Sequence, residues 1–249
     1  MFEGFSINMQ DNVILKTEKL SRHFWGLVAL TQVDMELKRG EILGIIGPNG
    51  AGKTTFINVL TGLFPPTEGR IIYEGKDISA LPAHIRSRIG IARTFQISRP
   101  LVDLTLLENV MTGALFARGL TRLQAIKKAS DVCGFMGLHD VDKPVSKLTA
   151  LEIKKMEVAR ALSTDPKVLM LDELMAGISS DEADEMMDLI KKIRNQGISL
   201  CVIEHVMRVI AALTDRVIVL DWGRTLAEGP YSEVSHNPMV IKAYLGEDA

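Results

Sequence analysis

A short glycine-rich segment, GPNGAGKTT at 47–55, has the residue types and spacing of a phosphate-binding loop. Its pattern is G-x-x-x-x-G-K-[ST], with an apolar stretch before it and a helical pattern after it. The glycines let backbone N–H groups approach phosphate oxygens, Lys53 adds a positive charge, and the Thr54 hydroxyl suits Mg²⁺. We expect the whole loop to contact a nucleotide: Gly47, Pro48, Asn49, Gly50, Ala51, Gly52, Lys53, Thr54 and Thr55.

Two acidic residues directly follow an apolar run in VLMLDE at 168–173. Because buried strands rarely end on paired carboxylates without cause, we interpret the pair as functional. Asp172 is placed to hold Mg²⁺ through water, and Glu173 to polarise an attacking water. A solvated strand end is the alternative interpretation when the pair is considered alone.

Two further apolar runs end on polar side chains that belong at the same edge of a parallel sheet. ISLCVIEH at 198–205 ends on His205, which would face the ligand crevice and bond both the γ-phosphate and the attacking water. IARTFQ at 91–96 ends on Gln96, a candidate to sense the metal and the water. A lone histidine is more often structural than catalytic, and that alternative stays open for His205.

Composition and charge limit the class of protein. The 249-residue chain has a formal net charge of −2, which gives no attraction to nucleic acid. No uncharged apolar run approaches the roughly 18–20 residues that span a bilayer. Two cysteines are too few for a disulfide framework, and MFEGFSINMQ lacks the features of a signal peptide. We expect a cytosolic protein that binds no nucleic acid and reaches a membrane only through a partner.

Alternating strand and helix patterns predict an α/β fold with a parallel sheet covered on both faces. Continuous apolar runs such as EILGIIG at 41–47 suit central strands, and a further strand is expected at 89–96. The segment 99–145 instead has helical spacing and hardly any strand signal. We predict one domain, 1–249, in which an α/β core (1–98 and 146–249) is interrupted by a helical subdomain (99–145).

Together, the phosphate loop, Gln96, the acidic strand end and His205 resemble the ATP-binding subunits of ABC transporters. The order and approximate spacing match, and the resemblance covers essentially the whole chain. It implies a P-loop NTPase core with a mostly parallel sheet, N-terminal antiparallel strands and an inserted helical subdomain. It also implies ATP and Mg²⁺ as cofactors, with three metal ligands: Thr54, Gln96 and Asp172.

The resemblance further implies an aromatic residue that stacks on adenine. HFWG at 23–26 offers Phe24 and Trp25, and counting back from the phosphate loop favours Phe24. Core packing of these aromatic side chains is the alternative.

Three segments, ARTFQ, LTLLENVMTGAL and VIKAYLG, are similar to the ATPases of branched-chain amino acid importers and their relatives, which carry other substrates including urea. This implies two ATPase subunits beneath two transmembrane permease subunits at the cytoplasmic face of the inner membrane, supplied by an extracytoplasmic solute-binding protein. We therefore predict ATP hydrolysis that powers uptake of a small polar solute of the branched-chain amino acid or amide class. The alternatives are a regulatory subunit with weak hydrolysis, a P-loop kinase, or an ABC ATPase outside transport.

The segment LTALE at 148–152 occupies the slot where the family has the signature L-S-G-G-Q, and an ordinary helix is the alternative. In the family this signature covers the γ-phosphate held by the other subunit. The resemblance thus implies nucleotide contacts from four residues: Thr149, Ala150, Leu151 and Glu152. Thr149 keeps the hydroxyl of the signature, but Leu151 replaces a glycine and adds bulk at the helix start.

Further departures from the family pattern fall at the same dimer interface: Leu174, Ser179 and Ser180. The signature of each subunit contacts the ATP that the other subunit holds. A heterodimer whose second chain has an intact signature would have one altered and one consensus ATP site, whereas a homodimer would have two altered sites. We therefore expect a heterodimer with a second, non-identical ATPase, and a homodimer is the alternative.

Overall fold

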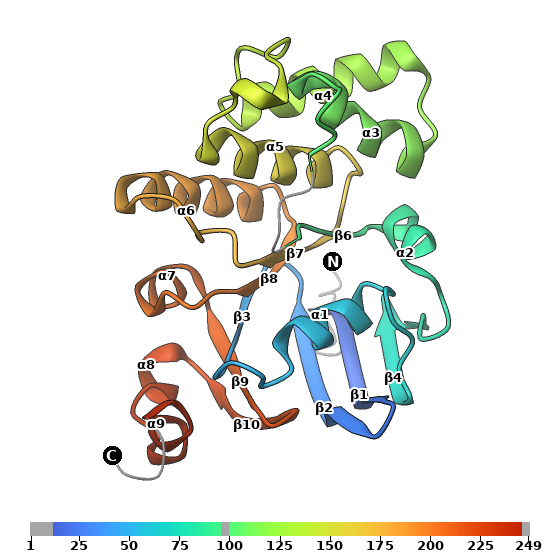
Figure 1. The fold of residues 1–249 in the computed structure, drawn as a ribbon. Helices are drawn as coiled ribbons and strands as arrows, with labels where there is room; N and C mark the ends of the chain where they lie inside the picture. The colour runs from blue at the N-terminus through green and yellow to red at the C-terminus, as the bar shows by residue number, and fades with distance from the viewer. Residues whose placement is uncertain (1–11, 96–99, 246–249) are drawn as a thin grey trace, which may run out of the picture.

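The computed structural model describes residues 12–95 and 100–245, which form two β-sheets and a layer of helices (Figure 1). The first sheet is antiparallel, in the order β2-β1-β4-β5. Its strands are β1 (Val13–Phe24), β2 (Leu27–Lys38), β4 (Glu68–Tyr73) and β5 (Lys76–Asp77). Gln96 of the predicted site lies outside the described residues.

The second sheet has six strands and is parallel except for its edge strand β10, which pairs antiparallel with β9. In spatial order its strands are β10 (Arg224–Gly229), β9 (Arg216–Asp221), β3 (Ile42–Ile46), β8 (Ser199–Ile203), β7 (Val168–Asp172) and β6 (Ile91–Arg93). The predicted α/β fold, with a mostly parallel sheet and N-terminal antiparallel strands, is confirmed.

The strand expected at 89–96 is shorter than the apolar pattern indicates. Ile89 belongs to helix α2 (Ala83–Ile89), and Gly90 ends that helix with a φ of 110°. The chain then has only three residues to pair with β7. The helix stop at Gly90 therefore sets where β6 begins.

Several helices begin at a signal that is visible in the sequence. Four of them start with Ser or Thr followed three residues later by Glu or Gln, and both hydrogen bonds of the capping box form in each. These helices are α3 (Leu106–Arg118), α4 (Arg122–Phe135), α5 (Ala150–Leu162) and α6 (Ser180–Asn195). Besides α2, the described residues also form α1 (Lys53–Leu60), α7 (Met207–Leu213), α8 (Tyr231–Val234), α9 (Pro238–Leu245) and the 3₁₀ turn Val145–Lys147.

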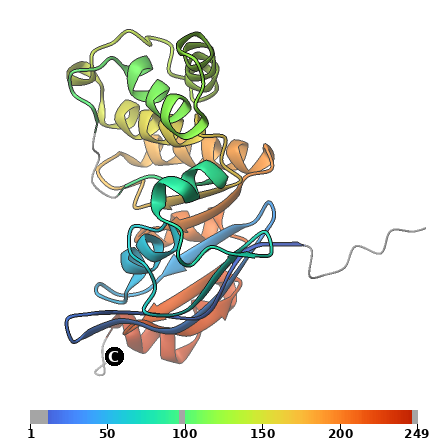
Figure 2. The same cartoon turned by 90° about the vertical axis from the view of Figure 1, so that its right-hand side faces the viewer.

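The central sheet separates two apolar cores because successive strand residues point to opposite faces. In β3, Leu43 and Ile45 pack with the antiparallel sheet and with α1 through residues such as Phe56. In β7 and β8, Leu169 and Val202 face the other core, which contains α3, α4, α5 and α6. Figure 2 shows this helical layer at one end of the molecule, away from the antiparallel sheet.

The helical layer is held together by a close approach of α3 to the end of α5. A Cβ atom at Gly113 would lie 2.2 Å from Ser163 Oγ, and that hydroxyl donates a hydrogen bond to Val110 O at 2.8 Å. Helix α5 therefore packs with α3 although it follows the predicted helical subdomain in the chain. The subdomain boundaries at 98 and 146 stay a prediction. Within 12–95 and 100–245, no helix has the length and apolar character needed to cross a bilayer.

Candidate functional site

The phosphate loop joins β3 to α1, and its backbone requires glycine at two positions. A Cβ atom at Gly47 would lie 2.1 Å from Leu220 O, and one at Gly52 would lie 2.7 Å from Ala29 O. Gly52 also has a φ of 101°, in the left-handed region. Since Gly52 immediately precedes α1, the loop N–H groups and the helix N-terminus share one anion-binding position.

Lys53 is buried within its own loop. Its ammonium donates hydrogen bonds to Gly47 O at 2.7 Å and to Pro48 O at 2.9 Å. Burial lowers the pKa of Lys53, and the charges of Glu173 and Asp172 oppose that shift. Phosphate oxygens would be stronger acceptors than two carbonyls, so the ammonium is placed to bind phosphate charge.

Asp172, the last residue of β7, carries a buried carboxylate with an unused oxygen. Its Oδ2 lies 3.5 Å from an Arg93 guanidinium nitrogen, while its Oδ1 has no hydrogen-bond partner among the described residues. Burial raises the pKa of Asp172, and Arg93 opposes this. A buried carboxylate oxygen without a partner is costly unless a cation or water meets it. This residue and the Thr54 hydroxyl are oxygen ligands of the kind that Mg²⁺ prefers.

Glu173 and His205 come together because β7 and β8 are parallel neighbours that end at the same edge, with Asp172 opposite Ile203. Glu173 Oε1 lies 2.7 Å from His205 Nε2. Glu173 has a φ of 50°, so the chain turns sharply just where this carboxylate is presented. A neutral His205 protonated on Nε2 would donate this hydrogen bond and hold the carboxylate in place.

A hollow of about 370 Å³ is lined by nine of the predicted site residues. The loop residues 49–55 form one side, and Glu173 and His205 also line it. Gly47 and Pro48 are outside the lining, but their carbonyl oxygens hold Lys53. Asp172 is likewise outside the lining. The structure thus brings together residues that are far apart in the chain.

Phe24, the predicted adenine contact, is not part of this lining. Its ring packs edge-on against Phe64, with centroids 5.2 Å apart, and the Arg22 guanidinium lies 4.4 Å from its centroid. Its neighbour Trp25 is fully exposed. Stacking of adenine on Phe24 therefore stays a prediction.

Sequence reasoning missed Trp222, which does line the hollow and is 85% exposed. It precedes Gly223 in the turn between β9 and β10. Gly223 N–H donates to Ala51 O at 3.0 Å, and Thr31 N–H donates to Gly223 O at 2.8 Å. These bonds fix the turn against the phosphate loop. A Trp-Gly pair after an apolar run was the only available signal in the sequence.

The segment 148–152 is the start of α5 and does not line the hollow. Thr149 is the N-cap residue, and its hydroxyl accepts a hydrogen bond from Glu152 N–H. The Glu152 carboxylate accepts from Thr149 N–H at 2.7 Å and pairs with Lys143 at 2.8 Å. Leu151 is half-buried and packs against the helical core. The Leu151 side chain, which was expected to add bulk at the helix start, therefore points partly into the protein interior.

The comparisons with known proteins agree with this geometry. The profile of the ABC transporter family matches residues 30–176, and that of a branched-chain amino acid ATP-binding cassette transporter matches 224–249. A probable branched-chain amino acid transport ATP-binding protein, LivG of Archaeoglobus fulgidus, is 37% identical over 245 residues, covering 94% of this chain and 95% of that protein.

Two solved structures match over nearly the full length. A nucleotide-free ATP-binding cassette from an ABC transporter has a TM-score of 0.87 and 32% identity, covering 94% of this chain and 100% of that one. The ADP conformation of an ATP-binding cassette has a TM-score of 0.86 and 32% identity, covering 94% and 99%. The phosphate loop, Glu173 and His205 line one hollow, and together with these matches they show that the chain belongs to the ABC transporter family, as an ATP-binding subunit.

Proposed function

We propose that this ATPase powers the uptake of a branched-chain amino acid or a similar small polar solute. Relatives named for branched-chain amino acid transport support that substrate class, and so does the match at 224–249. The observation that best supports hydrolysis is the hollow in which Lys53 and the Glu173–His205 pair meet. A regulatory subunit with weak hydrolysis would not need the water-positioning carboxylate.

The site would work with Mg²⁺. The unpartnered Oδ1 of Asp172 supports a role as ligand, and the Thr54 hydroxyl at the start of α1 is the second protein ligand that we propose. Gln96 is the third, and it lies outside the described residues. When bound, the ion would offset the charge of the phosphates.

The chain's own groups would position the reactants and balance charge. Lys53 binds the β- and γ-phosphates, and the loop N–H groups surround them. Glu173 orients the attacking water, while His205 holds that carboxylate and reaches toward the γ-phosphate. No covalent bond to the protein is required, so the rate enhancement comes from positioning and electrostatic stabilisation.

Replacing Phe24 by alanine is expected to weaken ATP binding about tenfold, because stacking of a base on an aromatic ring contributes roughly 1–3 kcal/mol. Trp25→Ala is the matched control, since Trp25 is adjacent and fully exposed. Calorimetry with a non-hydrolysable ATP analogue measures both affinities. If only Trp25→Ala weakens binding, the adenine contact belongs to Trp25 and not to Phe24.

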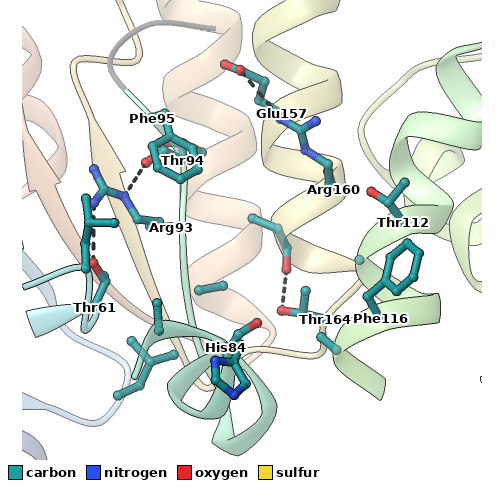
Figure 3. A pocket seen from close by; sticks show the side chains of 18 residues that line it. Thr61, His84, Arg93, Thr94, Phe95, Thr112, Phe116, Glu157, Arg160 and Thr164 are labelled. Atoms are coloured by element: carbon teal, nitrogen blue, oxygen red, sulfur yellow. Dashed lines mark hydrogen bonds and ion pairs between the residues drawn. The ribbon is translucent and has the colours of Figure 1, made fainter. Parts of the chain in front are cut away.

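A second hollow, of about 510 Å³, is the docking site that we propose for a permease subunit (Figure 3). It lies between α2, α3 and α5 and combines exposed Phe116 with the Glu157–Arg160 ion pair. Arg93 lines it, lies 4.5 Å from the centroid of Phe95, and approaches Asp172. A membrane-protein segment seated here would contact residues that reach the nucleotide site.

The assembly that we propose contains two ATPase chains and two permease chains at the cytoplasmic face of the membrane, fed by an extracytoplasmic solute-binding protein. Purifying the transporter from native membranes and identifying every chain by mass spectrometry tests this composition. Adding candidate solutes with the binding protein should stimulate ATP hydrolysis only for the transported class. Failure to recover any membrane chain would favour an ATPase outside transport.

We propose a heterodimer, in which Leu151 of this chain faces the ATP held by a different ATPase. Leu151→Gly is expected to raise turnover of the purified transporter severalfold, because glycine lets the helix N–H groups approach phosphate more closely. Since Leu151 also packs in the helical core, the same change should lower thermal stability. Leu151→Ala removes the bulk of the side chain without the backbone freedom that glycine adds, so it shows which of the two changes alters turnover. Brisk hydrolysis by a transporter with two copies of this chain, unchanged by Leu151→Gly, would contradict the asymmetry.

A further inference from the structure

A buried carboxylate beside the catalytic pair has no part in the chemistry described above. Glu204 lies between β8 and His205 and is 3% exposed, whereas the His205 side chain is 43% exposed. Glu204 Oε1 accepts a hydrogen bond from Met175 N–H at 2.8 Å. Burial raises the pKa of Glu204, and hydrogen bonds from the backbone of Met175 and Leu174 oppose that shift. The side chain therefore points inward, toward the segment that follows Glu173.

Two residues of the turn after β7 donate their N–H groups to β8 and to the residue that follows it. Glu173 N–H donates to Ile203 O at 2.9 Å, and Met175 N–H donates to Glu204 Oε1 at 2.8 Å. Glu173 has a left-handed φ of 50°, and its carbonyl accepts from Ala176 N–H at 3.3 Å. The Met175 N–H of this turn therefore meets a buried carboxylate of the same protein.

We propose that Glu204 is a positioning residue for ATP hydrolysis, because its carboxylate fixes the turn at 173–175 and so directs Glu173 at the attacking water. The inference rests on the function proposed for Glu173. Leu174 and Met175 are also anchored by packing, at 2% and 5% exposed, but apolar burial is non-directional. The hydrogen bond from Met175 N–H to Glu204 has a direction, so it orients the turn where packing does not.

The test compares Glu204→Gln and Glu204→Ala with wild type in the purified transporter. Glutamine keeps the size of the side chain but offers one acceptor, and its amide group faces backbone donors. We expect kcat to fall about tenfold for Glu204→Gln and further for Glu204→Ala, since small misplacements of a catalytic group are costly. The affinity for MgATP, measured by calorimetry, should stay within about twofold of wild type because the phosphate loop is untouched.

Glu41→Gln is the matched control. Glu41 is 7% exposed and accepts Lys38 N–H at 2.7 Å, but it precedes β3 at the opposite edge of the sheet. It should lower the melting temperature without changing kcat. Glu204 variants with wild-type kcat, or with kcat and MgATP affinity reduced together, would overturn the inference. Glu173→Gln is measured alongside: if that variant keeps turnover, the proposed role of Glu173 fails, whatever Glu204 does.

Discussion

Replacing Glu173 by glutamine is expected to lower ATP turnover about 100-fold or more while MgATP binding persists. Removing a general base or water-positioning group typically costs two to four orders of magnitude. The amide keeps the size of the side chain and can still contact His205, which lies 2.7 Å from Glu173 Oε1 in the present site. It cannot accept a proton from water. Phosphate release by the assembled transporter is the measurement.

The same variant should accumulate in an ATP-bound dimer, because binding would proceed and hydrolysis would not. Size-exclusion chromatography with and without ATP detects that state. Glu74→Gln is the matched control, since Glu74 pairs with Arg39 and Lys167 on the surface, outside the hollow. Turnover near that of wild type in Glu173→Gln would remove Glu173 from its role.

The sequence predicted those parts of the site that follow from local spacing. The loop at 47–55 places its glycines, Lys53 and Thr54 by chain connectivity alone, and the structure builds it between β3 and α1. The carboxyl ends of parallel strands meet at one sheet edge, so His205 was expected to face the ligand crevice, and the structure places it in contact with Glu173. Both results follow from general rules about parallel sheets.

Contacts that depend on three-dimensional packing were not predictable in the same way. The Arg93–Asp172 approach requires the register between β6 and β7, and the Glu204–Met175 bond requires the turn after β7. The apolar pattern of a strand predicts neither its register with a neighbour nor the turn that follows it. Trp222 enters the hollow only because Gly223 bonds to the phosphate loop.

The segment 148–152 carries a helix-start signal in its sequence, but we interpreted the segment as a signature that contacts nucleotide. Thr149 and Glu152 have the spacing of a capping box, and the structure forms both of its hydrogen bonds. Interpreting the segment as a signature assigns the same two side chains to a partner's nucleotide. Because the Thr149 hydroxyl and the Glu152 carboxylate are already engaged within α5, any contact with a partner's phosphate must come at the expense of these bonds or from backbone N–H groups.

Lys53→Ala is expected to weaken MgATP binding by roughly 10- to 100-fold and to stop hydrolysis. A hydrogen bond between charged groups contributes about 1.5–3 kcal/mol, and the ammonium serves two phosphates. In wild type the Lys53 ammonium is bound to Gly47 O and Pro48 O, so it is held in place before the nucleotide arrives. Calorimetry with an ATP analogue measures the affinity.

Lys53→Met distinguishes loss of charge from loss of packing. Both variants free the two carbonyl oxygens that Lys53 holds. Lys53 is 6% exposed, so alanine also leaves a cavity beneath the loop, whereas methionine fills most of the space of the lysine stem. If the positive charge of Lys53 is its main contribution to MgATP binding, both variants lose affinity for MgATP to a similar extent, and only Lys53→Ala shows a large drop in melting temperature. If Lys53→Met binds MgATP as wild type does, the loop N–H groups and the helix N-terminus suffice to hold the phosphates. In that case neither the charge of Lys53 nor its two carbonyl contacts are needed for binding, and its side chain serves to fill the space beneath the loop.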